Sequence, residues 1–380
     1  MALLGFHIVL SLIAATLTQK FPQFTICERL VHKNLKYYFL PEPPDSNDGR
    51  FRRKGKNKND GAVPDYRNQT FSMIMEKEIF TKLSYYSSLL WLVDYALVSI
   101  VVFTLCQIFV YFFPNDDSTN VSVLWTIFST MFALQILFKL LWKKFTNPNL
   151  GAERNLIFCF SLISFLLFMS LAENETALHF ERSSPLFLFV FASFMASLLG
   201  AAFLMPIVQY TSLYRLITED EKSIKTVFHH IVFLMPIFIL PLFFKPVQEH
   251  LLNQMPVLSI EHYSAIRTYL IILWALLRIF STKSLLQVYL ENAKEKGYAM
   301  CQTCGRLLTP AIVILYTALT LISLGQIFPL NSGRVSNNSS PNYINVILEP
   351  QIQRAVWTNG LFAGLCLHSV ISLVTIVFGV

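Results

Sequence analysis

Three ionisable side chains interrupt long apolar stretches of this sequence: Asp94, Arg278 and His368. A charge at the centre of a bilayer costs about 2.5–3.5 kcal/mol on insertion scales, so such residues mark structural or functional sites. Asp94 and Arg278 both fall in the inner half of their stretches, and we predict that they form an intramembrane ion pair. The pair either gates an ion pathway or fixes which helices are neighbours. His368 is either a proton-relay residue or a hydrogen-bonded residue on a packing face.

Small residues recur at helical spacing in two of the apolar stretches. Such rows let membrane helices approach closely, so we expect both to be packing seams. The seam residues are Ala192, Ala196 and Gly200 in one stretch and Gly360, Gly364, His368 and Ser372 in the last one.

Motifs for catalysis or for metal binding are missing from the sequence. Cys301 and Cys304 have the spacing of half a zinc site, but no second pair of ligands accompanies them. A nucleophile elbow, a His-Glu-x-x-His motif, a P-loop and a dinucleotide fingerprint are all lacking. We therefore expect neither an enzyme nor a bound cofactor.

The elements that must position these residues are membrane helices. Of the 380 residues, 54% are hydrophobic and 14% charged, against about 45–50% and 25% in soluble domains. A helix needs about 20 mostly apolar residues to cross a bilayer. The sequence predicts an all-α polytopic transmembrane helix bundle of eight to nine spans. The expected spans are 2–18, 89–112, 122–142, 155–172, 186–209, 229–245, 267–289, 307–328 and 355–379.

Three regions follow from this pattern. Residues 1–18 form an N-terminal apolar helix, which is either a retained signal-anchor, the reading that we favour, or a cleaved signal peptide. Residues 19–88 form a polar, basic region that is partly disordered, chiefly over 42–70, and residues 89–380 form a membrane bundle of eight helices. The basic run in the second region either binds anionic lipid headgroups, acts as a localisation signal or forms a solvated loop. Its cations are Arg50, Arg52, Arg53, Lys54, Lys56 and Lys58.

Loop charges set the orientation, because cytoplasmic loops carry an excess of Lys and Arg. Segments 143–154, 210–228 and 290–306, taken with Lys283, hold 10 such residues. The loops on the other side hold four. Region 19–88 therefore faces the cytoplasm, as does a helix-entry motif formed by Glu153 and Arg154. This protein belongs in the plasma membrane or the endoplasmic reticulum.

N-glycosylation sequons support this orientation. Those at Asn120, Asn174 and the overlapping pair Asn337 and Asn338 fall on the outer side, and we expect sugars at Asn174, Asn337 and Asn338. The sequon at Asn68 falls in the cytoplasm, so it is used only if the topology is inverted.

Several strings, in the same order along nearly the whole chain, resemble the transmembrane protein 161 family. They are Gln19-Lys20, Trp91-Leu-Val-Asp94, Gly151-Ala-Glu-Arg154, Glu173-Asn174, His230-Ile-Val-Phe-Leu-Met-Pro236, Lys245-Pro246, Leu276-Leu-Arg278 and Leu285-Leu-Gln-Val-Tyr-Leu290. The resemblance implies a glycosylated multi-pass protein without catalysis, linked to modulation of potassium and calcium currents, cardiac rhythm and protection from oxidative stress.

Three functional hypotheses remain. The first, which we favour, is a non-enzymatic protein that tunes ion currents through helix contacts with channel subunits or other membrane proteins. The second is a transporter or channel whose polar pathway is lined by Asp94, Arg278 and His368. The third is an assembly or trafficking factor that recruits clients. Nothing in the sequence indicates a nucleic-acid partner.

Overall fold

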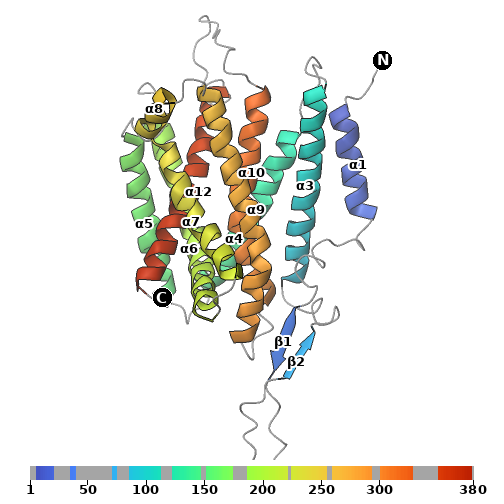
Figure 1. Ribbon diagram of the computed structural model, residues 1–380, viewed down its shortest axis with the longest axis vertical. Coiled ribbons are helices and arrows are strands. Elements are labelled where there is room, and N and C mark those ends of the chain that lie inside the picture. The colour runs from blue at the N-terminus through green and yellow to red at the C-terminus, as the bar shows by residue number, and fades with distance from the viewer. Residues whose placement is uncertain are drawn as a thin grey trace, which may run out of the picture.

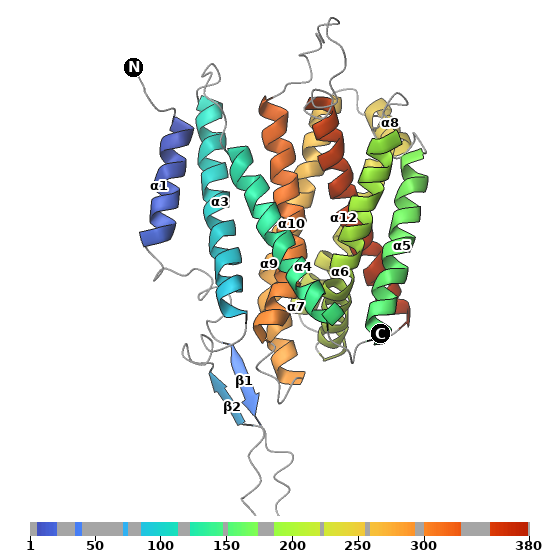
Figure 2. The ribbon, with the colours of Figure 1, turned by 180° about the vertical axis from the view of Figure 1, so that it is seen from behind.

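The computed structural model is a bundle of long helices that run alongside one another (Figures 1 and 2). It describes residues 6–20, 35–39, 71–74, 85–112, 122–146, 151–173, 186–220, 224–254, 259–292, 300–327 and 350–378. The basic run and the sequons at Asn68, Asn174, Asn337 and Asn338 lie outside these ranges, as does segment 42–70, so the predictions made for them stay predictions.

Eight described helices contain a stretch long and apolar enough to cross a membrane, which confirms the polytopic helical fold. They are α3 (Tyr86–Phe112), α4 (Ser122–Thr146), α5 (Gly151–Glu173), α6 (Leu186–Asp220), α7 (Ile224–Ile239) with η3 (Leu240–Phe243), α9 (Ile260–Asn292), α10 (Met300–Ile327) and α12 (Pro350–Phe378). A short helix, α8 (Lys245–Gln254), follows η3.

The structure describes the first expected span, 2–18, from Phe6 onward. Helix α1 (Phe6–Lys20) has 15 residues, which at about 1.5 Å per residue cover roughly 22 Å of a hydrocarbon core of about 30 Å. Helix α1 lies beside α3 (Figure 1), and its residue Ala14 packs against Val102 and Cys106 of α3. The indole N–H of Trp125 in α4 donates to the Ser11 hydroxyl over 3.0 Å.

Helix α10 forms the centre of the bundle. All ten residues 311–320 are buried, and α10 packs against α4, α6, α9 and α12. Helix α5 is the least buried span and packs chiefly on α6. The bundle therefore has a protein-facing helix at its core and a helix at its edge whose outer side chains face lipid.

Several spans differ from the ranges expected from sequence: α6 continues to Asp220, beyond the predicted end at 209, and α10 begins at Met300, before the predicted start at 307. The predicted span 229–245 begins earlier, and its α-helix ends at Ile239, because Pro241 has no N–H to continue the α-helical ladder and the chain tightens into a 3₁₀ turn. The predicted span 267–289 extends over the 33 residues of α9. Its polar residues Ser281 and Thr282 are accommodated because both hydroxyls donate to the Arg278 carbonyl, over 2.7 and 3.1 Å.

A two-stranded hairpin lies within the polar region 19–88 and was not predicted. Strand β1 (Lys36–Phe39) pairs antiparallel with β2 (Phe71–Ile74), with Lys36 opposite Ile74. The strands extend beyond one end of the bundle, at the end opposite α8 (Figure 1). The Lys36 backbone N–H donates to the Gln287 side-chain oxygen over 3.0 Å, which docks β1 against α9.

Candidate functional site

Arg278 is the most deeply buried charged side chain among the described residues, with 1% of its surface exposed. Its Nη1 lies 3.1 Å from Nε2 of His368, which is also 1% exposed. A guanidinium can only donate, so Nε2 of His368 is the acceptor and carries no proton. His368 is therefore a neutral imidazole protonated on Nδ1, held against a cation from α9.

Two aromatic rings complete this cluster. The guanidinium carbon of Arg278 lies 3.6 Å from the ring centroid of Tyr210 and 5.9 Å from that of Trp274. The imidazole of His368 lies 5.6 Å and 5.1 Å from the same two rings. The indole N–H of Trp274 donates to the Val232 carbonyl over 2.9 Å. We call Tyr210, Trp274, Arg278 and His368 the arginine cluster; through it and the Val232 bond, α6, α7, α9 and α12 are joined.

The predicted ion pair between Asp94 and Arg278 is not formed. Arg278 contacts His368 and the two aromatic rings instead, and no salt bridge joins it to a carboxylate of the described residues. The reason lies in the helix order: α3, which carries the half-buried Asp94, packs against α1, α4 and α10, whereas α9 packs against α6, α7 and α10. The sequence indicated that both charges lie at the same depth in the membrane. It did not show that the helices that carry them are not neighbours.

The two small-residue seams lie at contacts within the chain. A Cβ on Gly200 would come within 2.6 Å of the Ser164 hydroxyl on α5, and one on Gly364 within 3.2 Å of Ile314 on α10. A Cβ on Gly360, by contrast, would meet no atom within 4 Å. The seams therefore close the bundle at Gly200 and Gly364, whereas the space beside Gly360 is open.

The other seam residues follow the same pattern. Ala196 and Ser372 are buried, and Ala192 is half-buried. Ser197 follows Ala196 on α6, and its hydroxyl lies 2.7 Å from that of Ser161 on α5, which adds a hydrogen bond between the two helices.

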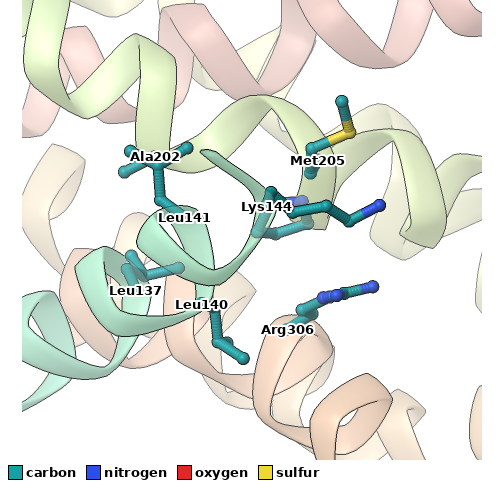
Figure 3. A pocket seen from close by; sticks show the side chains of 8 residues that line it. Leu137, Leu140, Leu141, Lys144, Ala202, Met205 and Arg306 are labelled. Atoms are coloured by element: carbon teal, nitrogen blue, oxygen red, sulfur yellow. The ribbon is translucent and has the colours of Figure 1, made fainter. Parts of the chain in front are cut away.

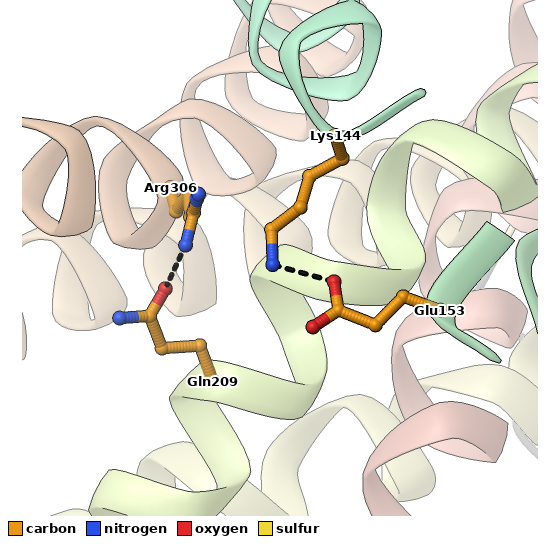
Figure 4. A network of polar contacts seen from close by, with 4 residues as sticks. All are labelled: Lys144, Glu153, Gln209 and Arg306. Atoms are coloured by element: carbon orange, nitrogen blue, oxygen red, sulfur yellow. Dashed lines mark hydrogen bonds and ion pairs between the residues drawn. The ribbon is translucent and has the colours of Figure 1, made fainter. Parts of the chain in front are cut away.

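A second polar network joins four helices near the ends of α4 and α10. The ammonium of Lys144 at the end of α4 donates to the Glu153 carboxylate at the start of α5 over 2.5 Å. Beside this ion pair, Arg306 of α10 donates to the Gln209 side-chain oxygen of α6 over 3.3 Å (Figure 4). Gln209 in turn donates to the Thr303 hydroxyl over 3.1 Å. Glu153 of the predicted helix-entry motif thus locks α5 to α4, while Arg154 is half-buried.

Lys144 and Arg306 also border a small cavity between α4, α6 and α10 (Figure 3). Its volume is about 10 Å³, on a measure by which roughly 10–15 Å³ is needed to hold a single water. Apolar side chains form most of its wall, among them Leu137 and Met205. The cavity is too small for an organic substrate.

Sequence reasoning missed Tyr210, Trp274, Gln209 and Arg306. Trp274 had a usable signal, because it precedes Arg278 by four residues and so lies on the same helix face. Tyr210 had none, since nothing in the sequence tells which face of α6 turns toward α9.

A family model described as "Predicted transmembrane protein 161AB" matches this chain over residues 2–181 and 171–331. The matched ranges include three of the four residues of the arginine cluster and the whole second network. No solved structure matches the chain.

Proposed function

Because this chain belongs to the transmembrane protein 161AB family, we propose that it acts as a non-enzymatic membrane protein that modulates potassium and calcium currents. The effect on cardiac rhythm, and any protection from oxidative stress, would follow from altered membrane excitability. The modulation of these currents would act through contacts with channel subunits, in the plasma membrane or in the endoplasmic reticulum. The link to ion currents comes from what the resemblance to this family implies, since the family's own description names a transmembrane protein and no activity.

One observation favours modulation over conduction by the chain itself. A pathway of its own would require Asp94, Arg278 and His368 to face a common route. Arg278 and His368 are each 1% exposed and are bonded to each other, while Asp94 lies on a helix that packs elsewhere. This arrangement supports a structural role for the cluster and argues against a shared ion route through the three residues.

Reconstitution separates the two functions. The purified full-length chain in liposomes should give no potassium or calcium flux above that of empty liposomes. In cells whose own copy has been removed, its expression should change the density of potassium or calcium current carried by channels already present. Flux through the purified protein that Asp94→Asn abolishes would contradict the proposal and support a transporter or channel.

Matched glycine variants test whether the effect depends on the packed bundle. Gly200→Leu places a large side chain against Ser164 and should reduce the change in current at equal surface abundance. Gly360→Ala, where a Cβ meets nothing within 4 Å, should behave as the wild type. Equal currents for both variants would separate modulation from the helix contacts proposed here.

A further inference from the structure

A groove lies on the outside of the bundle where α4 ends beside the start of α3. Its volume is about 700 Å³, within the range of roughly 300–1,000 Å³ that ligand sites occupy. It is lined by Tyr85, which directly precedes α3, and by residues of α4 between Gln135 and Thr146. We call it the lysine groove, after Lys139 and Lys143 in its wall. It lies at the hairpin end of the bundle, where α3 begins and α4 ends (Figure 2).

The two lysines of this groove have no carboxylate partner. Lys139 and Lys143 are four positions apart, so they share one face of α4, and both are exposed. Neither forms a salt bridge with a carboxylate of the described residues, and none of the described residues that line the groove is acidic. Lys144, by contrast, is paired with Glu153. The groove therefore carries two positive charges that its own described wall does not neutralise.

Aromatic side chains form much of the remaining wall. The ammonium of Lys143 lies 5.0 Å from the ring centroid of Tyr85, a cation–π contact between α4 and the start of α3. Trp142 is 71% exposed, and Phe138, also exposed, lies four residues farther from the end of α4, about 6 Å deeper along the axis. Trp and Tyr gather at the level of lipid headgroups. The groove thus joins two cations and two such rings at that level to an apolar side chain beneath them.

We infer that the lysine groove binds the phosphate-bearing headgroup of an anionic phospholipid, whose acyl chains lie along Trp142 and Phe138. Basic pockets between membrane helices bind such headgroups. A zwitterionic lipid would bring a cation of its own to Lys139 and Lys143, and a soluble anion would leave the apolar wall uncovered. In the orientation predicted from loop charges, this end of the bundle faces the cytoplasmic leaflet, which holds the anionic lipids.

The site differs from the basic run between Arg50 and Lys58, with which it shares no residue. It is also independent of the proposed modulation of ion currents, because it requires only that the bundle sits in a bilayer. Its test therefore needs a signal that arises in the groove itself, and Trp142 in the wall supplies one.

Bromine-labelled lipids provide this test in the purified full-length protein, because bromine on an acyl chain quenches a tryptophan that it contacts. Liposomes contain phosphatidylserine and phosphatidylcholine in a fixed ratio, and the bromine is carried by one lipid or by the other. The difference in quenching between the wild type and Trp142→Phe isolates Trp142. That difference should be larger when phosphatidylserine carries the bromine. Equal quenching of Trp142 by the two labelled lipids would overturn the inference.

A second tryptophan serves as the matched control. Trp91 on α3 is 66% exposed and does not line the groove. Its contribution, isolated in the same way with Trp91→Phe, should be quenched equally by the two labelled lipids. An equal preference for phosphatidylserine at Trp91 and Trp142 would show a general enrichment of anionic lipid around the protein and would overturn a site in the groove.

Lysine variants test whether the charge of the groove causes the preference. Lys139→Gln and Lys143→Gln should each lower the apparent affinity for phosphatidylserine about fivefold, the factor that one cation contributes near an anionic surface. Both side chains are exposed, so the variants should melt as the wild type does. The control Arg215→Gln, at an exposed arginine paired with Glu219, should keep the full preference. A preference at Trp142 that persists when both lysines are replaced would overturn the inference.

Discussion

The contact between α5 and α6 yields a prediction whose magnitude follows from a matched pair of glycines. In Gly200→Ala the new Cβ would lie 2.6 Å from the Ser164 hydroxyl and 3.1 Å from the Ser164 Cβ. That hydroxyl is held in place because it donates to the Phe160 carbonyl over 2.8 Å. Ser164 is buried, so the two helices must separate to make room.

The matched variant Gly360→Ala isolates this steric effect. Both substitutions gain the same helix propensity, about 1 kcal/mol, but only the one at Gly200 adds overpacking, which costs about 1–3 kcal/mol. Gly200→Ala should therefore be less stable than Gly360→Ala by about 1–3 kcal/mol. The added change Ser164→Ala removes the nearest atom and should recover part of the loss.

Reversible unfolding of the purified protein in mixed micelles, followed by tryptophan fluorescence, measures these differences. The three variants are compared with the wild type under one set of conditions. Equal stabilities for Gly200→Ala and Gly360→Ala, within about 0.5 kcal/mol, would show that the close approach of α5 and α6 is not a feature of the folded protein.

Three further predictions concern other contacts. His368→Leu removes the acceptor of the Arg278 N–H and should cost about 1.5–3 kcal/mol more than His368→Gln, whose amide oxygen can replace Nε2; equal melting curves would count against the bond. The Lys144–Glu153 pair is partly exposed, so a double-mutant cycle with Lys144→Ala and Glu153→Ala should give a coupling free energy of only about 0.5–1 kcal/mol. A coupling free energy of zero would show that the pair does not hold α4 and α5 together. Removal of the Asn68 sequon should leave the gel mobility of the glycosylated protein unchanged. A faster band would show that Asn68 carries a sugar and that the predicted topology is inverted.

Much of the fold could be predicted from sequence because entry into lipid depends on local composition. Each of the eight long helices overlaps one predicted span, since a run of about 20 apolar residues is favourable in a bilayer whatever its neighbours are, but the bounds differ most where polar residues extend a helix beyond its apolar run, at the end of α6 and at the starts of α9 and α10. The strand pair was missed because residues 40–70 separate β1 from β2 in the sequence, whereas a hairpin is recognised in a sequence from two strands joined by a turn of a few residues.

The partner of Arg278 required the tertiary structure. Sequence alone showed that a cation lies inside the membrane and that it needs compensation, because the cost of burying a charge depends on depth and on little else. Its contact with His368, 90 positions away, depends on how far each helix is rotated about its axis and on which helices are adjacent. Those two quantities follow from side-chain packing across the whole bundle, so charge and depth suggested Asp94 whereas packing brought His368, Tyr210 and Trp274 to the guanidinium.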